Sequence, residues 1–350
     1  MNHRISKLTR RFVDHAIDAF LVTKDVNITY LTEFNASESW LLVTLKQSFY
    51  ITDFRYILEA QKGLKGISIK QYTKTIHEAL FELVSSLKIK KIGFDDRHIS
   101  LNTYEQLKKK CPRSVSLLTV NSLVEDLREI KEPKEIAQIK KALGIHFKAY
   151  DFLKNIVRPG ISEKEVLFEL ENYVKKQNVG FSFSPIIASG PNSCFPHACV
   201  TDRMIKNNEP VLIDMGIDVN GYKSDLTRMF FLGKIPHSYS EMYEKVRRAQ
   251  QKAILSIRAG VKASVVDGQA RKYLEKFGLA KYFGHSLGHG VGLEIHEAPR
   301  LFQTSNAILK ENMIVTVEPA VYIPKQYGIR IEDMVLVHKQ GCEVLSEDYN

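Results

Sequence analysis

Two aspartates stand inside otherwise apolar, strand-like runs on either side of a turn. Asp214 lies in VLIDMG and Asp225 in YKSDLT, and Asn220–Gly221 between them is a hairpin turn signal. If the hairpin is symmetric, the two carboxylates face each other across the strands, about 5 Å apart. Like charges at that separation repel, so the pair needs a neutralising group, which a divalent metal ion would supply.

A second hairpin repeats this arrangement further along the chain. Glu318 follows the run IVTV and Glu332 follows GIRI, and residue 325, midway between them, falls in the loop PKQY. The spacing predicts a second opposed carboxylate pair. One such pair alone could be an edge strand with solvated acids, but two pairs in apolar strands favour a metal site.

The segment 285–297, HSLGHGVGLEIHE, combines three histidines with three glycines and does not have the pattern of a core helix. Glycines let the backbone approach a site closely. Neutral imidazole is a common ligand for Mn, Co, Zn and Fe. We therefore expect His289 to be a ligand and His285 and His296 to face a substrate. The segment is not an HExxH zinc helix, because no histidine lies four residues after His296.

His197 stands alone in the turn-rich segment SGPNSCFPHA, where it is either a hydrogen-bonded loop histidine or a residue bordering a cleft. Cys194 and Cys199 flank it, but no thiolate partner has metal-site spacing, so packing is the expected role of both. The four cysteines of the chain show no CxxC spacing, which favours reduced thiols in the cytoplasm.

Length and composition exclude several classes of protein. The chain has 350 residues, of which 44% are hydrophobic and 26% charged, as in a folded protein of about two domains. No apolar run is long enough to span a membrane, and the first twenty residues predict an amphipathic helix, not a signal peptide. The net charge is +10, but the lysines are scattered without interleaved aromatics, so we expect no nucleic-acid partner.

Residues 1–123 alternate between strand-like and helical segments, which predicts a small α/β domain. Strands are expected over 19–22, 40–45, 49–52 and 91–94, and a helix over 75–87. The charged segment 124–133, which ends at Pro133, is the expected linker.

The remainder, 134–350, predicts an α+β domain in which helices and strand hairpins are separate. Helices are expected over 134–156, after the capping box Ser162–Glu165, after Ser238–Glu241, and from Ser264 with Asp267 to Gly278; strands are expected within 181–189, 211–232 and 312–338.

The second domain resembles the proline-specific peptidases of the pita-bread metallopeptidase family, which comprise Xaa-Pro dipeptidases (prolidases) and Xaa-Pro aminopeptidases. The motifs that carry the resemblance, in the family's order, are IIASGPNSCFPHA, VLIDMGIDVNGYKSDLTRMF, HSLGHGVGLEIHE, IVTVEPAVYIP and GIRIEDMVLV. Residues 1–123 resemble the creatinase-type N-terminal domain more weakly. The resemblance implies an α/β N-terminal domain and an α+β pita-bread catalytic domain.

The resemblance also implies two divalent metal ions per chain, Mn or Co, held by five side chains. Carried over by motif, these ligands are Asp214, Asp225, His289, Glu318 and Glu332. Asp225 and Glu332 would bridge the two ions, and Glu318 would also accept a proton.

Further roles follow from the same motifs. His197 and His296 match histidines that steady the substrate's carbonyl oxygen and the intermediate, and His285 matches another active-site histidine. Thr227 and Arg330 would support the ligands. The implied reaction is hydrolysis of the Xaa-Pro bond of a small peptide with proline at the second position, by a homodimer.

Arg300 resembles an arginine of the shorter prolidases and would bind the carboxylate of a C-terminal proline, which favours a dipeptidase. An Xaa-Pro aminopeptidase acting on longer peptides stays open. The intact ligand set argues against a non-catalytic pita-bread binding protein and against a metal-free creatinase, and a methionine aminopeptidase fits the N-terminal domain less well. Ala320 departs from the family's usual glycine after Glu-Pro.

Overall fold

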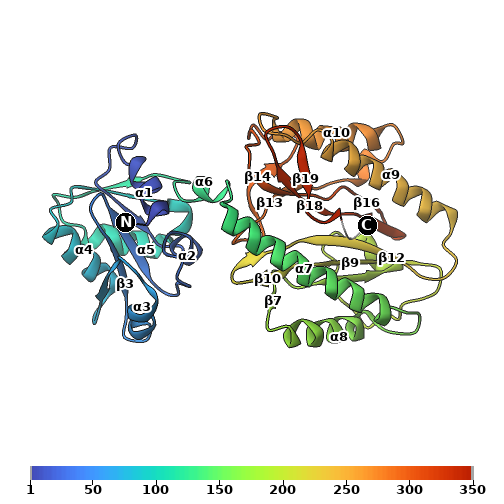
Figure 1. Ribbon diagram of the computed structural model, residues 1–350, viewed down its shortest axis with the longest axis horizontal. Helices are drawn as coiled ribbons and strands as arrows, with labels where there is room; N and C mark the ends of the chain where they lie inside the picture. The colour runs from blue at the N-terminus through green and yellow to red at the C-terminus, as the bar shows by residue number, and fades with distance from the viewer. Residues whose placement is uncertain (1, 348–350) are drawn as a thin grey trace. The chain divides into compact units, whose positions relative to one another are not determined.

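In the computed structural model, which describes residues 2–347, the chain forms two compact units that divide between Arg128 and Glu129 (Figure 1). The division falls inside the charged segment 124–133. Met1 and residues 348–350, at the outer ends of the two expected domains, lie outside the described residues.

The first unit is built on a mixed six-stranded sheet of order β4-β3-β2-β1-β5-β6. β1 pairs antiparallel with β2 and parallel with β5, and β2 and β3, which correspond to the strands expected over 40–45 and 49–52, pair antiparallel. The strands are β1 (Ala19–Val22), β2 (Trp40–Thr44), β3 (Ser48–Thr52), β4 (Ser68–Gln71), β5 (Lys91–Phe94) and β6 (Ser116–Thr119).

The helices of this unit complete the predicted α/β domain. They are α1 (His3–Arg10), α2 (Asp25–Thr32), α3 (Ile57–Gly63), α4 (Ile76–Ser86), α5 (Leu101–Lys110) and α6 (Glu125–Arg128), with a 3₁₀ turn, η1 (Asp96–His98). The first helix is shorter than predicted. It ends at Arg10, and a residue with positive φ, Ala16 (50°), turns the chain toward β1.

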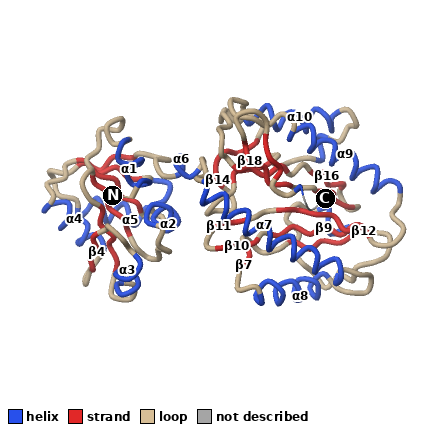
Figure 2. The backbone as a smooth tube through the Cα atoms, viewed as in Figure 1, coloured by secondary structure: helices blue, strands red, loops and turns tan. Residues whose placement is uncertain are grey.

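In the second unit, four helices form two packed pairs with the strands between them (Figures 1 and 2). The helices are α7 (Pro133–Ile156), α8 (Glu163–Lys176), α9 (His237–Ile254) and α10 (Ala263–Glu275), with 3₁₀ turns η2 (Gly190–Cys194) and η3 (Ala280–Tyr282). The predicted capping box of α8 is confirmed, because Glu165 N donates to Ser162 Oγ and Ser162 N donates to Glu165 Oε2.

The caps predicted for the other two helices are wrong. α9 begins directly after Pro236 and α10 after Lys262, and neither helix has a side-chain cap. Asp267 instead accepts hydrogen bonds from Arg271 and from the backbone N–H of Leu287, 3.1 Å away. This aspartate therefore fixes the start of the histidine-rich segment.

The strands of the second unit form three antiparallel sheets and a two-stranded hairpin, with orders β11-β10-β7, β12-β9-β8, β14-β13-β15-β18-β19 and β16-β17. Their bounds are β7 (Gly180–Phe181), β8 (Ile186–Ser189), β9 (Pro210–Met215), β10 (Ile217–Val219), β11 (Tyr222–Lys223), β12 (Leu226–Phe231), β13 (Gly288–Gly290), β14 (Glu297–Leu301), β15 (Ile314–Val317), β16 (Ala320–Ile323), β17 (Tyr327–Arg330), β18 (Asp333–Val337) and β19 (Cys342–Val344).

The register of the first carboxylate hairpin differs from the prediction. Asp214 pairs with Thr227, not with Asp225. The two-residue turn Asn220–Gly221, both residues with positive φ, fixes this register. Because side chains alternate with a period of two, a shift of two residues still leaves both aspartates on the same face of the sheet.

The register of the second hairpin is confirmed. β15 pairs with β18 and β16 with β17, and both ladders are centred on Lys325. Continuing that register places Glu318 opposite Glu332, at the point where the strands break between the two ladders.

Two apolar cores, one beneath each helix pair, hold these strands from both sides. The core beneath α7 and α8 includes Leu153 and Ile213, and the core beneath α9 and α10 includes Val315 and Ile329. The predicted α+β architecture of the second domain is thereby confirmed. Among residues 2–347, none of the helices has the length and apolar character needed to cross a membrane.

Candidate active site

A cavity of about 580 Å³ in the second unit gathers residues from widely separated strands and loops. It is lined by every side chain that was assigned a ligand, catalytic or substrate-binding role from the sequence, and by Arg330. These lining residues are His197, Asp214, Asp225, His285, His289, His296, Arg300, Glu318, Arg330 and Glu332. Thr227 does not line the cavity but is hydrogen-bonded to Glu332 and Arg330, which do.

The strands bring three of these side chains into one tight cluster. Asp225 precedes β12, His289 is the central residue of β13, and Glu332 lies between β17 and β18. One potential ligand atom from each lies within 4.8 Å of the others. All three residues are buried, with exposures of 4, 8 and 2%. Asp214 and Glu318 reach the same cavity from β9 and from the end of β15.

This concentration of buried acids is electrostatically unfavourable without a cation. Burial, together with the charges of Glu332 and Asp214, raises the pKa of Asp225 well above its ordinary value. Burial and the neighbouring charge of Glu318 do the same to the pKa of Glu332. A divalent cation would remove this penalty, because it favours the charged form of each carboxylate.

His289 is oriented as a metal-binding imidazole would be. Its Nδ1 lies 3.1 Å from the carbonyl oxygen of Gly290, which places the N–H at that nitrogen. Its Nε2 faces Asp225 Oδ2 at 3.6 Å and Glu318 Oε1 at 3.3 Å. In the neutral imidazole this nitrogen carries a lone pair, which a cation between these groups would accept.

The protonation of His289 and a buried oxygen of Asp214 both indicate that a cation fits between these groups. Burial would lower the pKa of His289, but the hydrogen bond to Glu318 raises it, so protonation is the alternative to metal binding. Asp214 Oδ1 is buried and has no hydrogen-bond partner among the described residues. Buried polar atoms of this kind are costly unless they are paired. The donor set therefore fits divalent metal ions.

Arg330 and Thr227 connect the two carboxylate hairpins. Arg330 Nη2 donates to Asp214 Oδ2 at 2.5 Å, and its Nε donates to Thr227 Oγ1 at 3.0 Å. Thr227 Oγ1 donates in turn to Glu332 Oε2 at 2.8 Å. The arginine, which is 3% exposed, thereby fixes the orientation of one carboxylate from each hairpin.

Two glycines in the histidine-rich segment are required because neighbouring strands approach closely. A Cβ atom on Gly288 would lie 2.0 Å from the carbonyl oxygen of Thr316, and one on Gly290 would lie 2.2 Å from that of Ala298. Both distances are far inside van der Waals contact. These glycines therefore allow β13 to carry His289 between β14 and β15.

The other three histidines surround the cluster. The ring of His296 meets the ring of His289 edge to face, with centroids 4.4 Å apart. His285 Nε2 lies 3.3 Å from the Tyr322 hydroxyl. Burial lowers the pKa of both His285 and His296, which keeps them neutral near pH 7. His197 is exposed on the loop that follows η2 and also borders the cavity.

The pattern of "Metallopeptidase family M24" matches residues 137–339, more than half of the chain. The matched segment contains all five carboxylate and imidazole groups described above. The chain belongs to metallopeptidase family M24. Residues 4–130 match a second pattern, "Creatinase/Prolidase N-terminal domain".

Individual members of the family resemble this chain over nearly its whole length. A Xaa-Pro dipeptidase of Pyrococcus horikoshii is 35% identical over 99% of this chain and 97% of its own. The structure of a Xaa-Pro dipeptidase from Bacillus anthracis is 36% identical, with a TM-score of 0.95 over 99% of this chain and 97% of its own. An X-Pro aminopeptidase structure from Thermotoga maritima is 31% identical, with a TM-score of 0.88 over 95 and 96%.

The M24 cavity also contains residues that the sequence did not single out. Phe183, Ile186 and Ile295 form an apolar part of its wall. Tyr322 is not among the lining residues, but its hydroxyl accepts a hydrogen bond from Arg330 Nη1 at 2.5 Å, and burial raises the pKa of that hydroxyl to about 12. The sequence evidence that could have identified Tyr322 is its place in the motif AVYIP, on the strand that follows Glu318.

The two cysteines beside His197 differ in their surroundings. Cys194 is partly buried, but Cys199 is exposed, so the packing role predicted for Cys199 is wrong. In this loop Ala198, not Cys199, occupies the buried position. Neither cysteine lines the M24 cavity.

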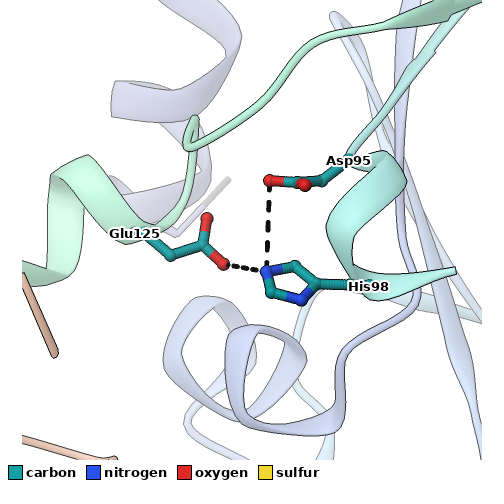
Figure 3. A group of neighbouring side chains, drawn as sticks. All are labelled: Asp95, His98 and Glu125. Atoms are coloured by element: carbon teal, nitrogen blue, oxygen red, sulfur yellow. Dashed lines mark hydrogen bonds and ion pairs between the residues drawn. The ribbon is translucent and has the colours of Figure 1, made fainter. Parts of the chain in front are cut away.

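A second group of potential metal ligands lies in the first unit, where Asp95, His98 and Glu125 meet (Figure 3). His98 Nε2 lies 2.6 Å from Glu125 Oε1 and 4.0 Å from Asp95 Oδ2. Arg97 donates to both oxygens of Asp95, and Asn27 Nδ2 donates to Glu125 at 2.7 Å. Because these carboxylates already have donors, the group serves to tie η1 to α6.

Proposed function

We propose that this M24 peptidase hydrolyses the Xaa-Pro bond of Xaa-Pro dipeptides with two divalent metal ions, Mn or Co. The observation that carries the proposal is the buried cluster of carboxylates around His289 in a cavity that also contains Arg300 and an apolar wall. The dipeptidase names of relatives that match this chain end to end support it.

The ions would be held by the five side chains that converge on the cavity: Asp214, Asp225, His289, Glu318 and Glu332. Oxygen-rich ligation with one imidazole suits Mn and related ions. When bound, such ions supply a water molecule acidic enough to act as a nucleophile at neutral pH.

A glutamate would then accept a proton, and histidines would stabilise the negative charge that develops on the substrate. In the metal-free site, burial would raise the pKa of Glu318, but the hydrogen bond and charge of His289 hold it below its ordinary value. With the ions bound, Glu318 would be the carboxylate that accepts a proton. Neutral His296, together with His197, which also lines the cavity, would donate hydrogen bonds to the substrate's carbonyl oxygen as negative charge develops there.

Arg300 and the apolar wall would recognise the C-terminal proline. The Arg300 guanidinium lies 4.8 Å from the centroid of the Phe302 ring, which supports it at the edge of the cavity. Phe183 and Ile295 would contact the pyrrolidine ring. A dipeptide carries its free carboxylate next to the cleaved bond, where a guanidinium can bind both oxygens.

Hydrolysis of a Xaa-Pro dipeptide and of the matching Xaa-Pro tripeptide, each with added Mn, tests this function. We expect the dipeptide to be the better substrate. Preferential cleavage of the tripeptide would favour the alternative, an Xaa-Pro aminopeptidase, which the likeness to the Thermotoga maritima structure supports. Cleavage of neither peptide by the Mn-loaded enzyme would contradict both.

Replacing Arg300 with alanine is expected to raise KM for Xaa-Pro dipeptides about tenfold or more, the effect of losing a charged hydrogen bond worth about 1.5 kcal/mol. Tripeptide cleavage should change little, since a longer peptide has no carboxylate at that position. Arg258→Ala, an exposed arginine outside the cavity, is the matched control. Equal effects on dipeptide and tripeptide would remove the reason for preferring a dipeptidase.

We also propose that the protein is a homodimer in the cytoplasm. Each chain would consist of an N-terminal domain over 1–123, a linker over 124–133 and a catalytic domain over 134–350. Free cysteines support the cytoplasmic location. Light scattering coupled to size-exclusion chromatography would test the dimer, and a monomeric mass at micromolar concentration would contradict it.

A further inference from the structure

A buried polar side chain behind the carboxylate cluster has no part in the chemistry proposed above. Gln250 lies on α9 and is 3% exposed. It shares its helix face with Val246, Ala249 and Ala253, which belong to the apolar core beneath α9 and α10. A buried amide in such surroundings is costly unless its N–H groups are hydrogen-bonded, so its partners reveal its role.

The Gln250 amide binds the backbone directly before both glutamates of the second hairpin. Its Nε2 lies 3.0 Å from the carbonyl oxygen of Val317 and 3.3 Å from that of Ile331. It also lies 3.0 Å from Asp333 Oδ2. Val317 precedes Glu318, and Ile331 precedes Glu332. One side chain thus connects the two strands at the break between their ladders.

The backbone on the other side of Glu332, its own carbonyl group, is hydrogen-bonded by Arg228. Arg228 Nη1 donates to the carbonyl oxygen of Glu332 at 2.5 Å, and its Nη2 donates to Asp333 Oδ1 at 2.8 Å. Ser346 Oγ donates to the same Asp333 oxygen. The carbonyl groups on both sides of the Glu332 residue are therefore fixed, one by Gln250 and the other by Arg228.

We propose that Gln250 is a positioning residue of the metal centre, which sets the separation of the Glu318 and Glu332 carboxylates through the two peptide groups that precede them. The proposal rests on the metal-ligand roles given above to these glutamates. Backbone ladders hold the hairpin on both sides of the break. At the break, Ile331 N donates to the carbonyl oxygen of Pro319 at 3.4 Å, and the Gln250 amide adds a second connection between the peptide groups that precede Glu318 and Glu332. Residues that orient metal ligands typically contribute about 10- to 100-fold to metal affinity.

The test is Mn binding by the metal-free full-length protein, measured by titration calorimetry without substrate. Gln250→Met keeps the length of the side chain and removes its donors, and we expect it to weaken Mn binding about 10- to 100-fold. Gln250→Asn keeps the amide but shortens its reach by one methylene, and we expect a smaller loss. If the methionine variant does not fold, the asparagine variant provides the same measurement.

The control is Gln251→Met, which changes the next residue of α9, an exposed side chain outside the cavity. It should leave Mn affinity within about twofold of the unmodified protein. A folded Gln250→Met protein with unchanged Mn affinity but a lower unfolding temperature would overturn the proposal, because Gln250 would then serve the core alone. Equal weakening by the control would also overturn it.

Mn binding and Xaa-Pro hydrolysis by the unmodified protein distinguish failure of the positioning role of Gln250 from failure of the proposed function. If it binds Mn but does not hydrolyse Xaa-Pro peptides, the substrate is wrong, and the comparison of the two glutamine variants still decides the role of Gln250. If it binds no divalent ion, the metal centre is wrong and the positioning role falls with it.

Discussion

Replacing Glu332 with alanine will empty at least one metal site and reduce Xaa-Pro hydrolysis by more than the roughly 10- to 100-fold typical of residues behind the ligands. Glu332 is 2% exposed and belongs to the tight cluster with Asp225 and His289. As a bridging ligand it would contribute to both ions, so its loss affects both. Elemental analysis of the purified variant, together with its rate of dipeptide hydrolysis, checks the expectation.

Glu343→Ala is the control for this variant. Glu343 lies on β19 in the same unit, and its partly exposed carboxylate pairs with Lys140 at 2.7 Å, away from the cavity. This change should leave metal content and turnover unaltered. A Glu332→Ala protein that kept two ions per chain and near-normal turnover would contradict the ligand assignment.

Replacing His296 with alanine will lower kcat about 10²-fold or more while both metal ions stay bound. The ring of His296 meets the ring of His289 edge to face, and burial lowers the pKa of His296, which leaves a neutral N–H donor for the substrate's carbonyl oxygen. Measuring kcat, KM and metal content on the same preparation separates loss of catalysis from loss of metal.

His338→Ala provides the comparison, because His338 is a partly exposed histidine that faces Glu343 at 3.6 Å outside the cavity. It should behave as the unmodified enzyme does. Loss of metal from His296→Ala, with His289 intact, would mean that the ligand and the catalytic histidine have been assigned the wrong way round.

The two carboxylate hairpins show how far sequence spacing determines a site. For Glu318 and Glu332, the midpoint fell in the loop on which the ladders are centred, so the opposed positions were predicted correctly. For Asp214 and Asp225, the Asn220–Gly221 turn shifted the register by two residues. The shared face was nevertheless correct, because a shift of two preserves the alternation of side chains.

Contacts between distant segments could not be predicted in the same way. Thr227 and Arg330 entered the site only through the family resemblance, and their hydrogen bonds join residues about a hundred positions apart. Nothing in the sequence indicated a role for Gln250. A glutamine in a helix is usually a surface residue, and only the structure shows that this amide is buried against two strands. The capping role predicted for Asp267 failed for the same reason, since a tertiary partner, Leu287 N, takes its carboxylate.

Dipeptide hydrolysis, measured before and after exhaustive chelation and again during stepwise addition of Mn, shows whether the protein is a Xaa-Pro dipeptidase that depends on a divalent metal centre. Because the buried carboxylates of Asp225 and Glu332 need cations to stay ionised, we expect activity to disappear on chelation. It should return as about two Mn ions bind per chain. Full hydrolysis by protein with no metal detectable by elemental analysis would show that the peptidase does not depend on a metal centre.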